Sequence, residues 1–263
     1  MSETLQVPIG EQEHLKEFFK QLSQNGQRQE AAEFSSLVSQ LSQMEEQYSA
    51  VLSELKAVRE QLDSLQDKGI KATAIKSVSA IQDRVAQGKD QLNHIKSDLS
   101  QAVRKALSAV KQHGISALNK VADFVGIKNA LNDMRDNLNA SIADTQKSID
   151  HINAVGNELH ALKEHGRNLG RVLVGKEATE LTARNEDKGV LAAVAKPLKK
   201  SKAMLERMEK GVTRALQSVE RLEQAAAKGR EEKPSVREGL KAAKQQENQV
   251  KPQTPHKKQE VSL

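Results

Sequence analysis

The fold follows from residues 34–65, which read FSSLVSQLSQMEEQYSAVLSELKAVREQLDSL. Apolar side chains recur in this stretch at spacings that alternate strictly between three and four residues. They are Phe34, Leu37, Leu41, Met44, Tyr48, Val51, Leu55, Val58, Leu62 and Leu65. This is the a and d pattern of a coiled coil, and it lasts for more than four heptads. It predicts one long helix whose apolar seam packs against other helices.

Comparable patterns fill most of the remaining chain. A short apolar stripe, Leu15 to Leu22, stops at the turn signal Asn25-Gly26. A second long helix is predicted from about Ile70 to His113, and a third closes near His165-Gly166 on a seam poorer in large side chains. The last pattern spans residues 191–226 and contains Pro197. Because proline disfavours helix at the residue before it, we expect a turn there and a fresh helix from Pro197.

These elements predict an all-α fold, an elongated antiparallel helical bundle or coiled coil with a disordered basic C-terminal tail. The predicted organisation has five parts. They are a disordered N-terminus (1–10), a bundle of long helices (11–165), a glycine-rich connector (166–189), a basic amphipathic helix (190–227) and the disordered tail (228–263). Heptads alone leave open whether the seams close within one chain or between chains.

Composition excludes several classes of protein. The chain has no Cys, so it has no disulfide framework, thiolate metal site or cysteine nucleophile. The first ten residues carry no Lys or Arg, which argues against a secretory signal. The longest apolar run, residues 190–195, is far shorter than the ~20 residues that span a bilayer. We therefore expect a cytoplasmic protein.

No motif predicts an enzyme, and we expect no catalytic residue, no metal site and no cofactor. Residues 170–176 read GRVLVGK and match the start of a phosphate-binding loop, but Glu177 replaces the Ser or Thr that binds magnesium. The alternative interpretation is that Val172, Leu173 and Val174 form an apolar plug on the end of the bundle. His151 and His160 would lie on opposite sides of one helix, so a single ion could not bridge them.

Basic side chains line the last predicted helix. They are Lys196, Lys199, Lys200, Arg207, Lys210, Arg214 and Arg221, and four of them recur at every seventh position. Such a stripe can contact a phosphate backbone, an anionic lipid surface or an acidic protein, or can simply be solvated. No aromatic residue follows Phe124, so base-stacking platforms and aromatic membrane anchors are lacking in this half.

Charge divides unevenly along the chain. Residues 1–66 hold 5 basic and 11 acidic side chains, a net of −6, which leaves +12 for the remainder because the whole chain is +6. The two parts are expected either to pack on each other or to present the basic part to an acidic partner.

These features predict a non-enzymatic interaction or scaffold protein that acts through coiled-coil self-association or docking. The heptad residues from Phe34 to Leu65 are the predicted protein interface. The alternative is a nucleic-acid-associated accessory protein that binds phosphate backbone through the basic helix and tail. Neither hypothesis calls for a membrane surface or a small-molecule substrate.

Three parts of the chain resemble a known family. They are QEAAEF (29–34) leading into QYSAVLSEL (47–55), then GISALN (114–119), and LGRVLVGKE (169–177). Together they resemble an uncharacterised family of helical proteins carried by integrative and conjugative elements of Gram-positive gut bacteria, over about residues 11–180. The resemblance implies a setting in a mobile genetic element and conjugation, and it supplies no catalytic residue.

Overall fold

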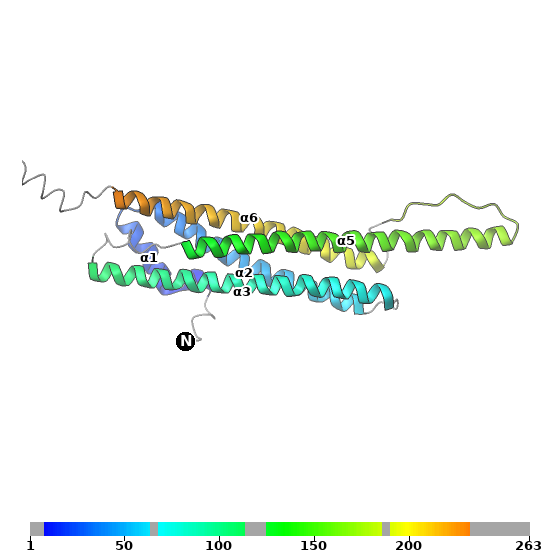
Figure 1. Ribbon diagram of the computed structural model, residues 1–263, viewed down its shortest axis with the longest axis horizontal. Coiled ribbons are helices and arrows are strands. Elements are labelled where there is room, and N and C mark those ends of the chain that lie inside the picture. Colours follow the sequence, from blue (N-terminus) through cyan, green and yellow to red (C-terminus); the bar gives the residue numbers. More distant parts are fainter. Residues whose placement is uncertain (1–7, 64–67, 114–124, 186–189, 232–263) are drawn as a thin grey trace, which may run out of the picture.

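The computed structural model describes residues 8–63, 68–113, 125–185 and 190–231. In these ranges every regular element is helical, which confirms the predicted all-α class (Figure 1). The elements are a short 3-10 turn η2 (Ile9–Glu11) and the helices α1 (Glu13–Gln24), α2 (Arg28–Asp63), α3 (Lys68–His113), α5 (Val125–Leu173) and α6 (Val190–Glu231).

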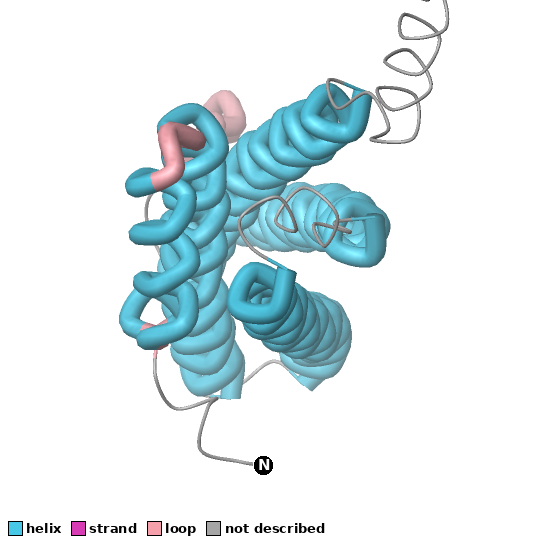
Figure 2. Tube along the Cα trace, turned by 90° about the vertical axis from the view of Figure 1, so that its left-hand side faces the viewer, coloured by secondary structure: helices cyan, strands magenta, loops and turns pink. Residues whose placement is uncertain are grey.

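The four long helices form an antiparallel up-and-down bundle. Contacts join α2 to α3, α3 to α5, α5 to α6 and α6 back to α2, so each long helix packs against two other long helices. The short helix α1 packs on α2 and α3, outside this ring (Figure 2). At ~1.5 Å per residue the 46 residues of α3 span about 69 Å, and the bundle is correspondingly elongated.

A glycine cap joins α1 to α2. Gly26 has a φ of 79°, a conformation that side chains with a Cβ rarely adopt. Its N–H donates to the Ser23 carbonyl, and the Gln27 N–H donates to the Leu22 carbonyl at 3.0 Å. This pair of bonds is the Schellman arrangement, which satisfies carbonyls at the end of α1 and reverses the chain.

The core follows the predicted heptad positions. Phe18 of α1 meets Phe34 edge to face, with ring centroids 4.8 Å apart. The buried stripes of α3 and α6 face α2, and large members of each, such as Ile95 and Leu205, are fully buried. Burial of these apolar side chains is the main force that holds the helices together.

The seam of α5 is poorer in large side chains, as predicted. Three buried positions of that seam are Ser141, Thr145 and Ser148. Each hydroxyl donates to the backbone carbonyl four residues earlier, at 2.9, 2.7 and 2.9 Å respectively. These bonds allow polar side chains to sit in the seam without an unpaired donor.

Some predicted boundaries are wrong. Helix α5 continues to Leu173 through Gly166 and Gly170, so the first part of the predicted connector is helical. Helix α6 runs unbroken through Pro197, because Val194 and Leu198 on either side of it are both fully buried and hold the first turns in place.

The ends of the chain also differ in part from the prediction. Ile9, predicted to belong to a disordered N-terminus, is fully buried within η2. Residues 228–231 extend α6. Residues 1–7, residues 114–124 within the predicted bundle and the rest of the predicted tail, 232–263, lie outside the described residues.

Candidate docking surface on helix α5

The predicted interface seam of α2 lies inside the bundle. Its nine described residues, Phe34, Leu37, Leu41, Met44, Tyr48, Val51, Leu55, Val58 and Leu62, are at most 2% exposed. The tenth, Leu65, lies outside the described residues. Helices α3 and α6 of the same chain contact α2 on two sides. These residues therefore meet other helices of the same chain and offer no free surface to a partner.

The basic stripe lies on the outward face of α6. All seven of its side chains are exposed. Two of them bind acidic residues of α2: Lys200 Nζ lies 2.8 Å from Glu54 Oε2, and Arg221 Nη1 lies 2.8 Å from Glu33 Oε1. The acidic first part and the basic last part thus pack on each other. Within the described part of the chain the other five basic residues form no ion pair.

The motif GRVLVGK is the end of a helix and not a phosphate-binding loop. Gly175 has a φ of 78°. Its N–H donates to the Val172 carbonyl at 2.9 Å, and the Lys176 N–H donates to the Arg171 carbonyl at 2.9 Å. This second Schellman cap closes α5. A helix C-terminus presents carbonyl groups and a negative dipole end, which repel a phosphate.

Histidine and carboxylate side chains were the candidate metal ligands. In the described ranges no group of three or more His, Cys, Asp or Glu side chains is placed to hold an ion. His160 instead donates from Nε2 to the Thr182 carbonyl at 2.9 Å. This histidine, one of the two considered above as metal ligands, thus forms a local structural contact.

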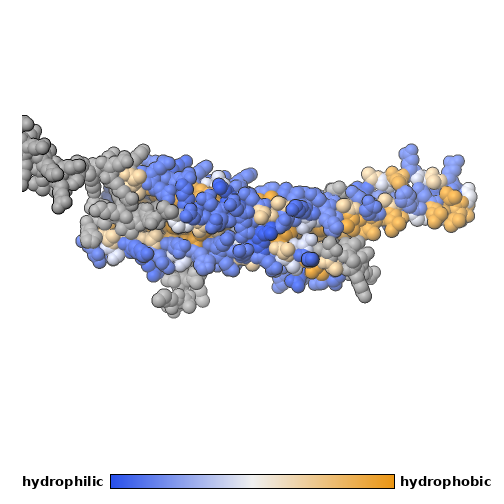
Figure 3. Space-filling view, viewed as in Figure 1, coloured by the Kyte–Doolittle hydropathy of each residue, from blue (hydrophilic) through white to orange (hydrophobic). Residues whose placement is uncertain are grey.

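Helix α5 projects past the other helices at one end of the bundle (Figure 1). Across the described residues eight large apolar side chains are exposed, and seven of them belong to this projection or to the segment that follows it. These seven are Leu159, Leu162, Leu169, Val172, Leu173, Val174 and Leu181, with exposed fractions of 43–78%. Figure 3 shows an apolar region on the projecting end. Val172 to Val174 therefore do not plug the bundle, and that interpretation is wrong.

The exposed leucines continue the seam that α5 uses inside the bundle. The a positions fall every seven residues at Leu131, Leu138, Thr145, Ile152, Leu159, Gly166 and Leu173. The d positions are Ile127, Met134, Ser141, Ser148, Val155, Leu162 and Leu169. Up to Ile152 every a and d residue is buried. From Leu159 onward every one is exposed, although the pattern does not change. We call residues 157–173 with this face the open seam.

The segment that follows α5, residues 174–185, runs along the side of the projecting helix opposite the open seam. We call it the return segment. Asn168 Nδ2 donates to the Thr179 carbonyl at 2.7 Å, and Asn168 Oδ1 accepts from the Thr179 N–H and hydroxyl at 3.0 Å each. Arg171 Nε donates to the Glu177 carbonyl at 2.9 Å. At 100° per residue Asn168 and Arg171 lie roughly opposite the open seam. The segment thus pairs with the polar face and leaves the apolar face uncovered.

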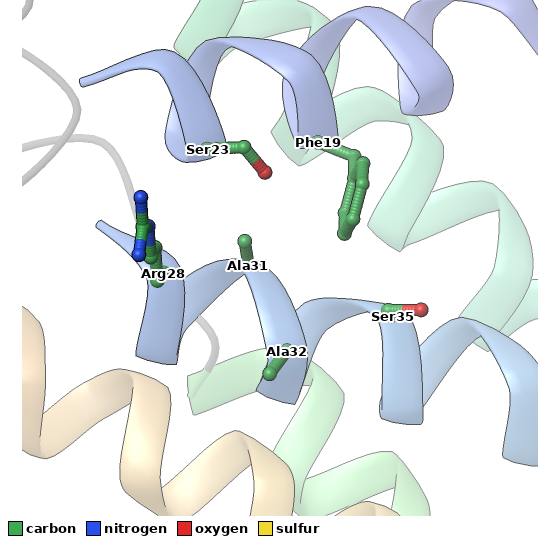
Figure 4. Close-up of a pocket in the computed structure, with 6 residues that line it drawn as sticks. All are labelled: Phe19, Ser23, Arg28, Ala31, Ala32 and Ser35. Atoms are coloured by element: carbon green, nitrogen blue, oxygen red, sulfur yellow. The ribbon is translucent and has the colours of Figure 1, made fainter. Parts of the chain in front are cut away.

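A second, smaller candidate lies between α1 and α2. Figure 4 shows this groove, with Phe19 and Ser23 on one side and Arg28, Ala31, Ala32 and Ser35 on the other. Phe19, which lines this groove, is 42% exposed. The groove offers one aromatic side chain and small neighbours, whereas the open seam offers several large apolar side chains in a continuous register.

Shifted pKa values lie away from the open seam. Burial raises the pKa of Tyr48. Burial, together with the charge of Arg104, lowers the pKa of His14. A side-chain hydrogen bond to Glu220 raises the pKa of Lys128, and Glu223 adds to the effect. The partners of His14 and Lys128 lie on other helices, so these two groups join helices.

The sequence contains a signal for the open seam that the prediction missed. The a and d spacing continues beyond Leu159 at Leu162, Leu169 and Leu173. Gly166 and Gly170 interrupt it, however, and glycine commonly marks the end of a helix in a sequence. Each glycine costs only ~1 kcal/mol of helix propensity relative to Ala, so neither is a sufficient reason for a helix to stop.

Three comparisons bear on identity. In the part of the chain that the structure describes, no helix is long and apolar enough to cross a bilayer. No curated protein and no solved structure matches the chain. A family of unknown function does match, over more of the chain than the resemblance covered, since it takes in the basic helix and reaches residue 262. With residues 11–262 matched, the chain belongs to the family of unknown function DUF6674.

Proposed function

We propose that this chain is a non-enzymatic helical interaction or scaffold protein that docks a helix of a partner on the open seam. One observation carries the proposal. The a and d seam of α5 is covered by the chain's own helices up to Ile152 and then continues in the same register with its side chains exposed.

The chemistry of the open seam favours a helical partner. Side chains spaced three and four residues apart form the holes that receive the side chains of a facing helix. Amphipathic helices commonly bind a partner by packing their apolar face against an apolar surface of that partner. Contiguous apolar surface is also rare on monomeric proteins unless it serves an interaction.

The seam of α2 supports docking less well. A partner helix would have to displace α3 or α6, and so expose a face that is now at most 2% exposed from Phe34 to Leu62. Exposing that much apolar surface costs more than a new contact returns unless the partner replaces it completely.

Photo-crosslinking in the cells that naturally produce the protein tests the proposal. The photoreactive residue p-benzoylphenylalanine replaces either Lys163, beside the open seam, or Ala143, an exposed position on the outer face of the same helix. We expect crosslinked product from position 163 and not from position 143. A chain that carries both Leu162→Glu and Leu169→Glu should give no crosslinked product from position 163. Equal yields at both positions, or yields that ignore the two substitutions, would contradict the proposal.

A nucleic-acid accessory role is the second candidate. It is favoured by five exposed basic residues of α6 that have no ion pair among the described residues: Lys196, Lys199, Arg207, Lys210 and Arg214. If they bind phosphate backbone, affinity for a labelled duplex must fall steeply with salt and hardly depend on base sequence. Arg207→Glu with Arg214→Glu should weaken that binding. Absence of binding at low salt would remove this candidate.

The biological setting is part of the same proposal. The resemblance of residues 29–34, 47–55, 114–119 and 169–177 to proteins of integrative and conjugative elements supports an accessory role in the maintenance or transfer of a mobile genetic element. A cytoplasmic location fits a chain that has no Cys to pair.

A further inference from the structure

We propose that the occupant of the open seam is a second copy of this chain, whose own open seam packs against the first in antiparallel orientation. This inference rests on the proposed function, since it names the partner of the same surface. It is carried by the shape of the projection, by the self-complementary order of its side chains and by its charge.

The shape of the molecule selects the orientation. The open seam faces the space that lies directly beyond the end of the bundle, because it continues the face of α5 that meets α3 and α6. A parallel second copy would run its α5 back from that space into the end of the first bundle. An antiparallel copy runs its α5 away from the first bundle, so only this orientation avoids a collision.

The length of the projection also fits an antiparallel pair. Residues 157–173 are helical and, at ~1.5 Å per residue, about 25 Å long. When a positions face d positions, Leu173 of the second copy lies opposite Val155 of the first. Val155 is half-buried at the end of the bundle, so the second helix ends where the covered part of the seam begins.

The order of side chains along the open seam is self-complementary. In this register Leu159 faces Leu169 of the second copy, and Leu162 faces Gly166. The antiparallel pair has a two-fold axis, so each of these pairs occurs twice: Leu169 of the first copy also faces Leu159 of the second, and Gly166 also faces Leu162. Large side chains thus meet either a large apolar side chain or the gap above a glycine, where a Cβ would have no neighbour within 4 Å. No charged residue enters any of these layers.

Charge does not oppose such a pair. The projecting helix 157–173 contains three basic residues, Lys163, Arg167 and Arg171, against Glu158 and Glu164, for a net of +1. Glu164 Oε1 already binds Arg167 Nη1 at 2.9 Å. Two copies therefore meet with almost no net repulsion, unlike the basic outer face of α6.

The first test is the solution mass of the full chain by sedimentation equilibrium over a concentration series. The chain mass is 28.9 kDa, and we expect the average mass to rise toward twice this value with concentration. Leu162→Glu with Leu169→Glu should hold the mass at the monomer value. A matched control, Ala143→Glu with Ala154→Glu, adds the same charge at exposed outer positions of α5 and should dimerise like the unsubstituted chain.

The second test fixes the orientation. Because the chain has no Cys, single cysteines can be placed without background. A mixture of Leu159→Cys and Leu169→Cys chains, treated with a short bifunctional thiol reagent, should give crosslinks between the two variants. Each variant alone should give few, since its two cysteines would lie about 15 Å apart along the pair. Efficient crosslinking of each variant with itself would overturn the antiparallel arrangement.

The outcomes separate this inference from the proposed function. The chain could stay monomeric at all concentrations while position 163 still crosslinks to another protein in cells. That result would overturn the proposed dimer but would agree with the docking function. A monomer that gives no crosslink from position 163 overturns both. A mass increase that survives the two glutamate substitutions places the contact elsewhere and overturns the inference.

Discussion

At the scale of single residues, the contact of Gly88 with Tyr48 sets how closely α3 approaches α2. A Cβ on Gly88 would lie 2.6 Å from the Tyr48 hydroxyl oxygen and 2.9 Å from its ring carbon Cε1. Tyr48 is 1% exposed and cannot move aside without displacing its neighbours. The glycine thus supplies space, although it weakens the helix by ~1 kcal/mol relative to Ala.

This contact predicts that Gly88→Ala destabilises the chain by about 1–3 kcal/mol, because overpacking outweighs the gain in helix propensity. Urea denaturation measures the change. Gly126→Ala is the control, since a Cβ there meets nothing within 4 Å and should leave the free energy of unfolding unchanged or slightly higher. A Gly88→Ala chain as stable as the original would mean that the helices can separate at no cost.

His14 gives the attachment of α1 a pH dependence. Its ring Nε2 and the Ser100 hydroxyl oxygen of α3 form a 2.7 Å hydrogen bond, and burial and then the charge of Arg104 lower the pKa of His14 below its usual 6.5. Because the unfolded chain takes up the proton at higher pH than the folded one, stability falls as pH drops through 6.5 toward the lowered folded pKa.

The measurement is the difference in unfolding free energy between the original chain and His14→Gln at pH ~7.5 and ~5. We expect the original chain to lose more stability than the variant on acidification, since only it carries this titrating group. A difference that is the same at both pH values would show that His14 does not contribute.

At the scale of elements, one helix carries the same heptad pattern in two environments. Leu138 and Leu162 both belong to the seam of α5, but Leu138 is 2% exposed and Leu162 is 70% exposed. Leu138→Ala should therefore cost about 2–5 kcal/mol, through lost burial and the cavity left behind. Leu162→Ala should change stability by less than about 0.5 kcal/mol.

Denaturant unfolding of the two variants, at a concentration where the chain is monomeric, tests this difference. Comparable losses would mean that residues after Ile152 are also covered within the chain. The open seam would then not exist as a surface.

The same helix shows how far prediction from sequence reached. From Phe34 to Leu62 the seam of α2 was predictable residue by residue, because regularly spaced apolar positions without glycine or proline admit a single helical face. The end of α5 was not, because Gly166 and Gly170 are weak local signals, and the sequence pattern does not reveal that Asn168 pairs with Thr179. Nor was the continuity of α6 through Pro197, where burial on both sides overrides the local preference.

Exposure was the other property that the pattern could not supply. A heptad predicts that a face is apolar, but which helices cover it depends on where each helix ends in three dimensions. Ile152 and Leu159 occupy equivalent a positions one heptad apart, yet Ile152 is 4% exposed and Leu159 is 43% exposed, because the bundle ends between them. The heptad residues of the predicted interface are thus buried within the chain, and the exposed apolar face lies on α5.

At the scale of the whole molecule, the bundle and the projection differ in how far their apolar side chains are covered. The bundle closes its own seams and joins its acidic and basic parts through Glu33–Arg221 and Glu54–Lys200. The projection extends about 25 Å beyond it and carries most of the exposed large apolar side chains of the described chain. An end-to-end pair of such molecules would be a rod, with the two basic faces of α6 far apart.

Small-angle X-ray scattering over a concentration series measures both mass and length, and so distinguishes a monomer from a pair joined along the open seams. One molecule, taken as the bundle plus the projection, is about 95 Å long, and two molecules that overlap along their open seams are about 165 Å long. We expect the original chain to approach the longer dimension as its mass doubles, and the chain with both Leu162→Glu and Leu169→Glu to keep the shorter one. A doubled mass without the increase in length would contradict this pairing, because the copies would then lie side by side.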